Sequence, residues 1–146
     1  MSLVYTEIMH LSASLLVGGS LSLLSGSYLP LVLSLVAGFF IDGDHLIDYL
    51  IFRGSRVTLK GFFSGNYFKE SQKAYIFLHS WELAFGIVSL GLVANSSLLF
   101  YSVGLSLAVH LLIDQFTNSP GLYAYFLYHR ITHKFDLKSS FPLCSP

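Results

Sequence analysis

The feature that most limits the fold of this chain is a set of four long apolar stretches. They cover about residues 3–24, 29–52, 74–94 and 97–118. A bilayer core about 30 Å thick needs roughly 20 mostly apolar residues per helix, and each stretch comes near that length. Only 11% of the residues are charged and 53% are hydrophobic, whereas soluble domains carry about 25% charged residues. The sequence therefore predicts an all-α integral membrane protein, a four-helix bundle running up, down, up and down.

The connections between these stretches predict the domain organisation. Two turns are short and uncharged, whereas residues 53–73 are too rich in Gly, Ser and charge to cross lipid. We predict one membrane domain over residues 1–120, in which residues 53–73 form a cytoplasmic loop long enough to be a lid. An aromatic and basic stretch follows, so residues 121–146 are predicted to be an amphipathic interfacial segment.

The basic residues predict the orientation. All eight lie in the loop or the C-terminal segment: Arg53, Arg56, Lys60, Lys69, Lys73, Arg130, Lys134 and Lys138. With four spans they share one side, which the positive-inside rule makes the cytoplasm. We expect a multi-pass protein of the inner (cytoplasmic) membrane with both termini in the cytoplasm. No cleavable signal peptide is expected, and the zero net charge predicts no attraction to nucleic acid. The single cysteine, Cys144, excludes an intramolecular disulfide.

Polar residues occur inside the apolar stretches, but only near one end of each. His10 lies near the start of the first stretch, residues 42–48 near the end of the second, His79 and Glu82 near the start of the third, and His110 and Asp114 near the end of the fourth. Starts of odd helices and ends of even helices meet at the same membrane face. These groups are therefore expected to converge at one depth, just inside the cytoplasmic boundary.

Such a cluster needs a compensating interaction, because an Asp at mid-bilayer costs about 2.5–3.5 kcal/mol. The candidates are protonation, water, His–carboxylate hydrogen bonds or a bound metal. Imidazole and carboxylate are ligands of zinc, manganese and iron, and His110 and Asp114 lie one helical turn apart. Asp42 and Asp44 lie about 200° apart on an ideal helix. We therefore predict a helix end or kink at Gly43.

Four elements in order, "MHLSAS", "FIDGDH", "LHS" and "GLSLAVHLLIDQFTN", resemble the membrane-bound, metal-dependent hydrolases over about residues 1–120. That family's pattern is an early His, Pro-Asp-x-Asp-His, His-Arg-x-x-Thr-His-Ser and Gly-x-x-x-His-x-x-x-Asp-x-x-Thr. Here Ile41 replaces the Pro, and the His-Arg of the third element is missing. The resemblance implies a metal and catalytic set of His10, Asp42, Asp44, His45, His79, His110 and Asp114. More distantly, the all-helical layout with HxxxD resembles zinc-dependent phospholipase C in architecture only.

The expected activity is hydrolysis of an ester or phosphoester, in a membrane lipid or another amphiphile, at the cytoplasmic face. One or two divalent ions would activate water, with zinc favoured and manganese or iron as alternatives. Glu82 is predicted to be the base or an extra ligand, and Asp44 is counted with it among the catalytic carboxylates. Asp48 is predicted to orient an imidazole. Arg53, Arg56 and the aromatic loop are available to hold the substrate.

Two other classes stay open. A divalent-cation or proton transporter also places His and Asp in a membrane, but it usually shows polar groups along the whole depth and often an inverted repeat. A purely structural bundle would use the cluster only to set helix register. Two further sets of residues are not assigned to the metal site. His129 and His133 are interpreted as lipid-headgroup contacts, and the stripe Gly18, Ser22 and Gly26 is interpreted as close helix packing.

Overall fold

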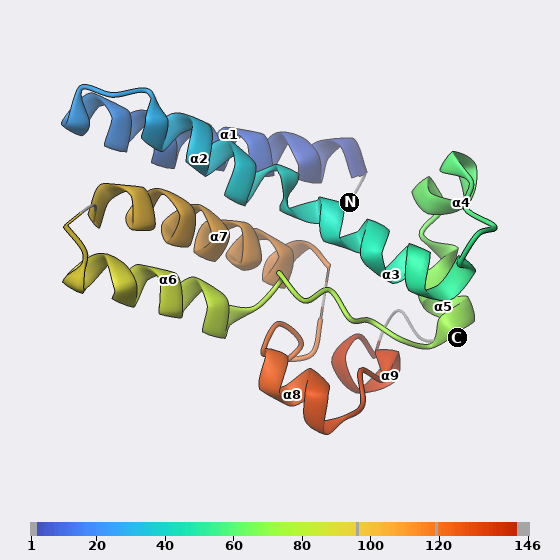
Figure 1. Ribbon diagram of the computed structural model, residues 1–146. Helices are drawn as coiled ribbons and strands as arrows, with labels where there is room; N and C mark the ends of the chain where they lie inside the picture. The colour runs from blue at the N-terminus through green and yellow to red at the C-terminus, as the bar shows by residue number, and fades with distance from the viewer. Residues whose placement is uncertain (1–2, 96, 119, 143–146) are drawn as a thin grey trace.

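The computed structural model describes residues 3–95, 97–118 and 120–142, and every regular element within these ranges is helical (Figure 1). The prediction of an all-α fold is confirmed. The longer helices are α1 (Leu3–Ser25), α2 (Leu29–Gly38), α6 (Trp81–Val93) and α7 (Ser97–Thr117). The shorter elements are a 3₁₀ turn, η1 (Phe40–Asp44), and the helices α3 (His45–Arg53), α4 (Leu59–Phe63), α5 (Asn66–Ser71), α8 (Leu127–Thr132) and α9 (Leu137–Ser140). Cys144 lies outside the described residues.

Helix length supports two to three membrane spans. The segments Tyr5–Ser25 and Ser97–Thr117 are long and apolar enough to cross a membrane. A third span is present if α2 and the η1–α3 pair count as one element, whose halves are bent by 46°. The helix of the third predicted stretch, α6, begins only at Trp81 and has 13 residues. At about 1.5 Å per residue it reaches about 20 Å, which is less than a bilayer core of about 30 Å.

The α-helix of the second apolar stretch is interrupted from Phe39 to Asp44, a range that includes Gly43, where a break is predicted, and the break begins at Phe39 between α2 and η1. Gly38 lies at a close contact with two other helices. A Cβ atom at this position would lie 2.5 Å from Ser14 Oγ in α1 and 3.0 Å from Ser106 Cβ in α7. Only glycine allows this approach. The break therefore begins where α2 meets its neighbours, upstream of the acidic residues.

The central helix of the bundle is α7, which packs against α1, α2 and α6. Small side chains lie where the helices cross. Ser34 Oγ donates to Ser102 O at 3.2 Å, and a Cβ atom at Gly18 would lie 2.7 Å from Ser34 Cβ. Small residues let helix backbones approach closely, which agrees with the interpretation of Gly18 as a packing residue. Gly26, predicted as part of the same stripe, follows the end of α1, and a Cβ atom there would meet nothing within 4 Å.

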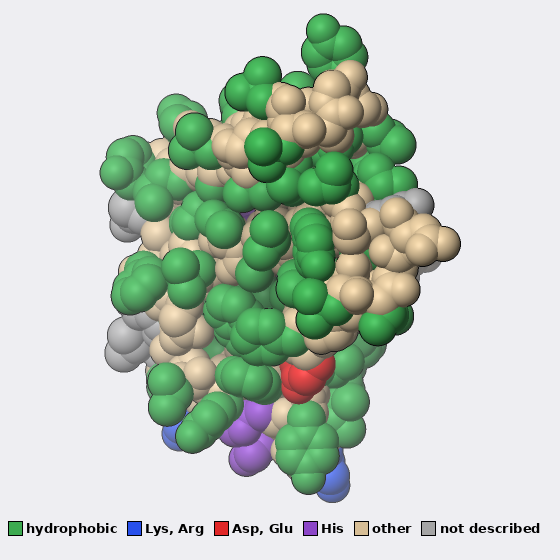
Figure 2. All heavy atoms as spheres, turned by 90° about the vertical axis from the view of Figure 1, so that its left-hand side faces the viewer, with side chains coloured by type: hydrophobic (Ala, Val, Ile, Leu, Met, Phe, Trp, Pro, Cys, Tyr) green, Lys and Arg blue, Asp and Glu red, His purple; other side chains and the backbone are tan. Residues whose placement is uncertain are grey.

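The two ends of the bundle differ in charge. Residues 12–38 and 83–109, which include the α1–α2 and α6–α7 turns, contain no charged residue. Figure 2 looks at the end that carries these turns and shows mainly hydrophobic and uncharged polar side chains, with histidine and charged groups only toward its lower edge. The charged residues lie at the other end of the long helices or in the shorter segments attached there.

The C-terminal segment folds back onto the residues that precede α6. The Ala74 N–H donates to Phe135 O at 3.0 Å, and the Trp81 N–H donates to Tyr125 O at 2.9 Å. Several C-terminal side chains are buried in the core, namely Tyr125, Leu137 and Phe141. Residues 74–80 bond their backbone groups partly in this way, which explains why α6 starts late. The described part of 121–146 is thus joined more closely to the rest than a boundary at residue 120 predicts, while its contact with lipid stays a prediction.

Candidate metal centre

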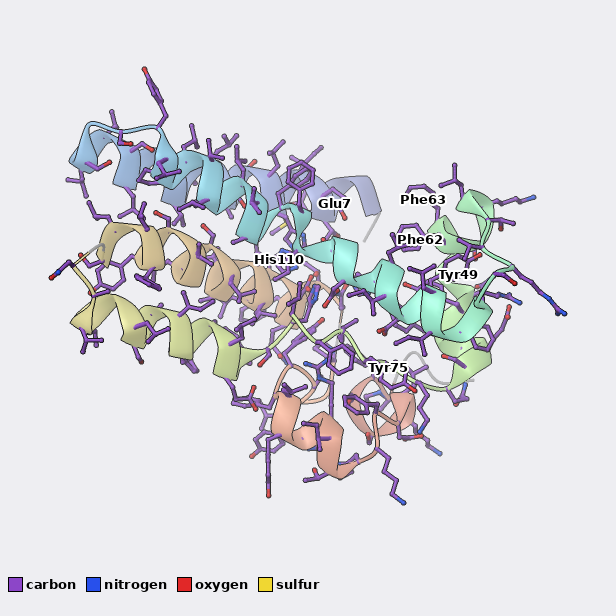
Figure 3. All side chains as sticks on the ribbon, in the orientation of Figure 1. Glu7, Tyr49, Phe62, Phe63, Tyr75 and His110 are labelled. Carbon is purple, nitrogen blue, oxygen red and sulfur yellow. The ribbon has the colours of Figure 1, made fainter. Side chains whose placement is uncertain are left out.

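The residues predicted as metal ligands lie together at the charged end of the long helices. They come from α1, from η1 and the start of α3, from the segment before α6, and from α7: His10, Asp42, Asp44, His45, His79, His110 and Asp114. All are buried except Asp42 and His45, which are partly exposed. Figure 3 shows His110 deep between the helices and Glu7 above it, near the start of α1. The meeting of these side chains at one level is therefore a property of the fold.

A central group is formed by Asp42, His79, His110 and Asp114. His79 Nε2 lies 3.1 Å from His110 Nε2 and 3.1 Å from Asp42 Oδ1. His110 Nε2 lies 3.3 Å from Asp114 Oδ2. One donor atom from each residue lies within 4.8 Å of the others. Four such atoms surround a space suited to one cation.

The tautomers of the two central imidazoles follow from their other contacts. His110 Nδ1 lies 2.8 Å from Gly38 O, and His79 Nδ1 lies 3.1 Å from Asp44 Oδ2. A carbonyl and a carboxylate only accept, so Nδ1 carries the hydrogen in both rings and Nε2 presents a lone pair. Two lone pairs 3.1 Å apart repel each other unless a proton or a metal lies between them. Metal-ligating histidines are commonly held by such a hydrogen bond on the other nitrogen.

Asp42 presents its two oxygens to different partners. Oδ1 lies 3.4 Å from His45 Nε2 and also faces His79, whereas Oδ2 lies 3.5 Å from His10 Nδ1. A second possible metal group on the Oδ2 side consists of Glu7, His10 and Asp42. Asp42 thus belongs to both groups of possible metal ligands. Glu7 is not among the predicted ligands, although its position three residues before His10 puts both on one helical face.

The environment of His10 tests whether these residues fit a metal. Its imidazole is buried; Nδ1 lies 3.5 Å from Asp42 Oδ2 and Nε2 lies 3.3 Å from Asp114 Oδ1, but among the described residues neither nitrogen forms a hydrogen bond. Leaving such a buried group unsatisfied costs about 1–3 kcal/mol, which coordination of an ion would offset. Imidazole and carboxylate donors together fit zinc, and also manganese or iron. The site therefore has the ligand chemistry that the sequence predicts.

Asp44 lies behind His79 rather than beside Asp42. Its Oδ2 accepts the Leu78 N–H at 3.0 Å and faces Nδ1 of His79, whereas Asp42 faces Nε2 of the same ring. The two carboxylates therefore lie on opposite sides of one imidazole and do not aim at a common point. In this geometry Asp44 orients the His79 imidazole. A third possible metal group, Asp44 with His45 and His79, lies on the Nδ1 side of that imidazole.

The structure does not bring Glu82 to the cluster. Its carboxylate accepts the N–H groups of Leu127 at 2.9 Å and Tyr128 at 3.0 Å, and the hydroxyl of Ser80 at 2.8 Å. These bonds connect the start of α6 to the start of α8. The prediction of Glu82 as base or ligand is therefore wrong in this geometry, because its oxygens serve the C-terminal segment.

Arg130, predicted only as part of a basic interfacial segment, is fully buried next to the backbone that carries His79. Its guanidinium donates to the carbonyl oxygens of Tyr75, of Ile76 at 2.7 Å and of His79 at 2.6 Å. Burial lowers the pKa of Arg130, while the carboxylates of Asp44 and other nearby acids act in the opposite direction. Since a guanidinium stays charged in proteins, a buried cation holds three carbonyl groups of this segment.

Asp48 holds the same segment through its N–H groups. Its carboxylate accepts from the Tyr75 N–H at 2.8 Å and from the Ile76 N–H at 3.1 Å. The prediction that Asp48 orients an imidazole is wrong, since it orients backbone instead. Ile76 has a φ of +29°, a conformation that is rare for a β-branched residue and costs about 1–3 kcal/mol. The bonds from Asp48 and Arg130 stabilise this strained segment, which ends at His79.

Asn118 and Tyr125 extend the site beyond the predicted residues. Asn118 Nδ2 donates to Asp114 Oδ1 at 3.1 Å and to the Tyr125 hydroxyl at 3.3 Å. Burial raises the pKa of Tyr125, so this hydroxyl stays neutral. Asn118 follows Asp114 by one helical turn, and that spacing is the signal in the sequence that identifies it.

His129 and His133 lie on α8 and in the residue that follows it, apart from the cluster. His133 is exposed and His129 is half-buried, their ring centroids are 4.1 Å apart, and His133 Nδ1 lies 2.8 Å from His129 O. Their proposed contact with lipid headgroups stays a prediction.

A cavity of about 960 Å³ adjoins the cluster. Its polar lining includes Glu7, His10, Asp42, His45, His79 and Asp114. Its apolar lining comes mainly from α4 and α5 and from the C-terminal segment. Figure 3 shows Phe62 and Phe63 pointing from α4 toward the start of α3, on the side where Glu7 lies. A polar floor and aromatic walls therefore share one cavity.

Comparison with protein-family models, curated proteins and solved structures gives no match. The resemblance to membrane-bound, metal-dependent hydrolases thus depends on the short motifs alone.

Proposed function

We propose that this chain is a membrane-embedded, metal-dependent hydrolase that cleaves an ester or phosphoester of a lipid or another amphiphile. The observation that supports it most is the central group, in which two Nε2 lone pairs and two carboxylates face one space. The imidazole of His10, which lies between the carboxylates of Asp42 and Asp114 without a hydrogen bond, and the two-sided contacts of Asp42 support a second ion next to the first.

In this proposal His79, His110, Asp42 and Asp114 hold one divalent ion, and Asp42, His10 and Glu7 hold or face a second. Zinc is favoured, with manganese or iron as alternatives. Such ions lower the pKa of bound water toward 7 and polarise the scissile oxygen. Glu7 lies at the edge of the cavity and takes the place of Glu82 as the candidate base. Asp44 and Asn118 keep His79 and Asp114 in position.

The proposed membrane arrangement keeps four crossings, with α6 and residues 74–80 forming the third. The positive-inside rule then places the basic loop, the C-terminal segment and the cluster at the cytoplasmic side of an inner membrane. The uncharged end of the bundle faces the other side.

A transporter is less well supported by the contacts between the helices. Three of the buried serines between the helices are engaged with backbone: Ser14 Oγ donates to His10 O at 2.8 Å, Ser34 Oγ to Ser102 O at 3.2 Å and Ser102 Oγ to Leu98 O at 2.6 Å. Ser106 Oγ, also buried, has no hydrogen-bond partner among the described residues. The three hydrogen bonds leave few free ligands along the uncharged half. Liposome flux of divalent cations or protons is the discriminating measurement.

The hydrolase proposal is tested by metal analysis of the protein purified in detergent. We expect stoichiometric metal in the wild type, substoichiometric metal in His110→Ala and wild-type metal in the control His133→Ala. A panel of lipid esters and phosphoesters then tests activity on the metal-loaded protein. Unchanged metal in His110→Ala contradicts the site, whereas full metal without turnover of any panel member contradicts the hydrolase.

A further inference from the structure

The apolar part of the cavity begins at a cluster residue. The Phe68 ring lies 5.5 Å from the His45 ring, centroid to centroid, and Tyr67 lies 4.3 Å from Phe68. Phe62 continues the series, stacked at 6.4 Å from Tyr67. A continuous aromatic wall thus leads from the cluster to α4.

This wall is anchored to α3. Tyr49 is buried, its hydroxyl accepts the Thr58 N–H at 3.1 Å, and its ring lies 5.2 Å from that of Tyr67. A side chain at Gly61 would collide with the Tyr49 hydroxyl, so α4 packs directly on this ring. Burial raises the pKa of Tyr67, which keeps this part of the wall uncharged. The cavity wall is therefore built by packing.

The cavity opens at the surface between aromatic side chains. Two lining residues, Phe40 and Phe63, are 66% and 70% exposed, and Leu59 on α4 is 78% exposed. The lining contributed by the described residues contains no Lys or Arg. Exposed apolar side chains beside membrane-spanning helices belong in the bilayer interface. An occupant that enters between Phe40 and Phe63 therefore arrives from the lipid side and meets aromatic side chains before the cluster.

We infer that the aromatic part of the cavity binds the hydrocarbon chain of the lipid whose head group lies at the cluster. This inference rests on the proposed function, because it names the substrate class of the same site. Pockets of about 300–1,000 Å³ hold drug-sized ligands, so there is room for a chain together with a head group. A small polar ester would leave the aromatic wall unfilled, whereas a lipid satisfies both parts of the cavity.

The test uses palmitic acid with a terminal diazirine, added to the protein in lipid nanodiscs and activated by light. We expect labelled positions within residues 59–73, and labelling there should saturate and be competed by unlabelled palmitic acid. Lipid around the outer helix faces labels without saturation. The experiment is done with metal bound and after chelation, since the chain itself needs no ion.

A filled cavity supplies the decisive variant. Gly43 lines the cavity, and a Cβ atom there meets nothing within 4 Å, so Gly43→Leu occupies the space without backbone strain. Labelling of residues 59–73 should fall roughly tenfold, the loss expected when about two methylene groups are displaced. Gly19→Leu, on α1 and equally open, is the matched control and should label like the wild type. A second pair of variants consists of Phe62→Ala, which changes the cavity wall, and its control Phe85→Ala, which lies on α6 outside the cavity lining.

Labelling of residues 59–73 that does not saturate, or that is unchanged in both Gly43→Leu and Phe62→Ala, overturns the inference. Its failure is separable from that of the hydrolase. Saturable labelling without turnover of any ester contradicts the hydrolase alone. Turnover of short-chain esters without saturable labelling contradicts the chain-binding site alone.

Discussion

Three histidines of the cluster are held in two different ways. His10 and His110 belong to the long helices α1 and α7, so regular helix geometry and close packing at small residues position them. His79 lies in an irregular segment, and charged side chains position it instead, namely Asp44, Asp48 and Arg130. The comparison shows that one site combines a helix-borne half, robust in its local geometry, with a loop-borne half that depends on buried ionic contacts.

The largest expected effect is on the loop-borne half. Arg130→Met removes the donor for three carbonyl groups, and because each buried acceptor left unsatisfied costs about 1–3 kcal/mol, the variant should lose at least about 3 kcal/mol of stability. Denaturant unfolding in detergent measures this loss, and metal content should fall with it. Arg130→Lys should lie between the wild type and Arg130→Met, because an ammonium cannot form the same fork. Arg56→Met, at an exposed position, is the control. Equal losses of stability in the two Met variants would contradict the view that Arg130 holds the segment before His79.

The helix-borne half is tested by Gly38→Ala. The added methyl group would lie 2.5 Å from Ser14 Oγ, so α1, α2 and α7 must shift, at a cost of about 1–3 kcal/mol. Gly19→Ala meets no neighbour and should instead stabilise α1 by up to about 1 kcal/mol. Opposite signs in thermal unfolding are the expected result. A neutral Gly38→Ala would mean that close helix packing does not position His10 and His110.

Asp44→Asn tests a single ligand of the loop-borne half, His79. The carboxylate orients His79 from behind, and loss of such a partner typically lowers metal affinity about 10–100-fold. Competition with a zinc chelator measures the change, with Glu70→Gln as an exposed control. A zinc affinity within a factor of about two of the wild-type value would show that Asp44 does not orient a metal ligand.

The smallest expected effect is that of Asn118→Ala. Its amide donates to Asp114 on α7, where the helix backbone already positions the carboxylate. We expect a loss of zinc affinity near the lower limit, about tenfold, without a change in thermal stability. Asn95→Ala, in the exposed α6–α7 turn, is the control. If Asn118→Ala lost more zinc affinity than Asp44→Asn, the helix-borne half would depend more on side-chain contacts than the loop-borne half, which would contradict the comparison.

The sequence alone predicts the helix-borne half well. Apolar length identifies α1 and α7, and the spacing of His110 and Asp114 places both on one face. The error at Glu82 has the same origin, because a spacing of three residues from His79 assumes a helix that starts only at Trp81. Helical spacing is informative only where the residues are helical.

The sequence by itself determined what depends on local periodicity: the helical class, the apolar stretches and the common level of the polar residues. The tertiary structure decided the start of the break at Phe39, the orienting role of Asp44 and the burial of Arg130. Those features depend on contacts such as that between Arg130 and His79, which are 51 residues apart. No local pattern encodes such a pairing, because its free energy arises only when distant segments exclude water together.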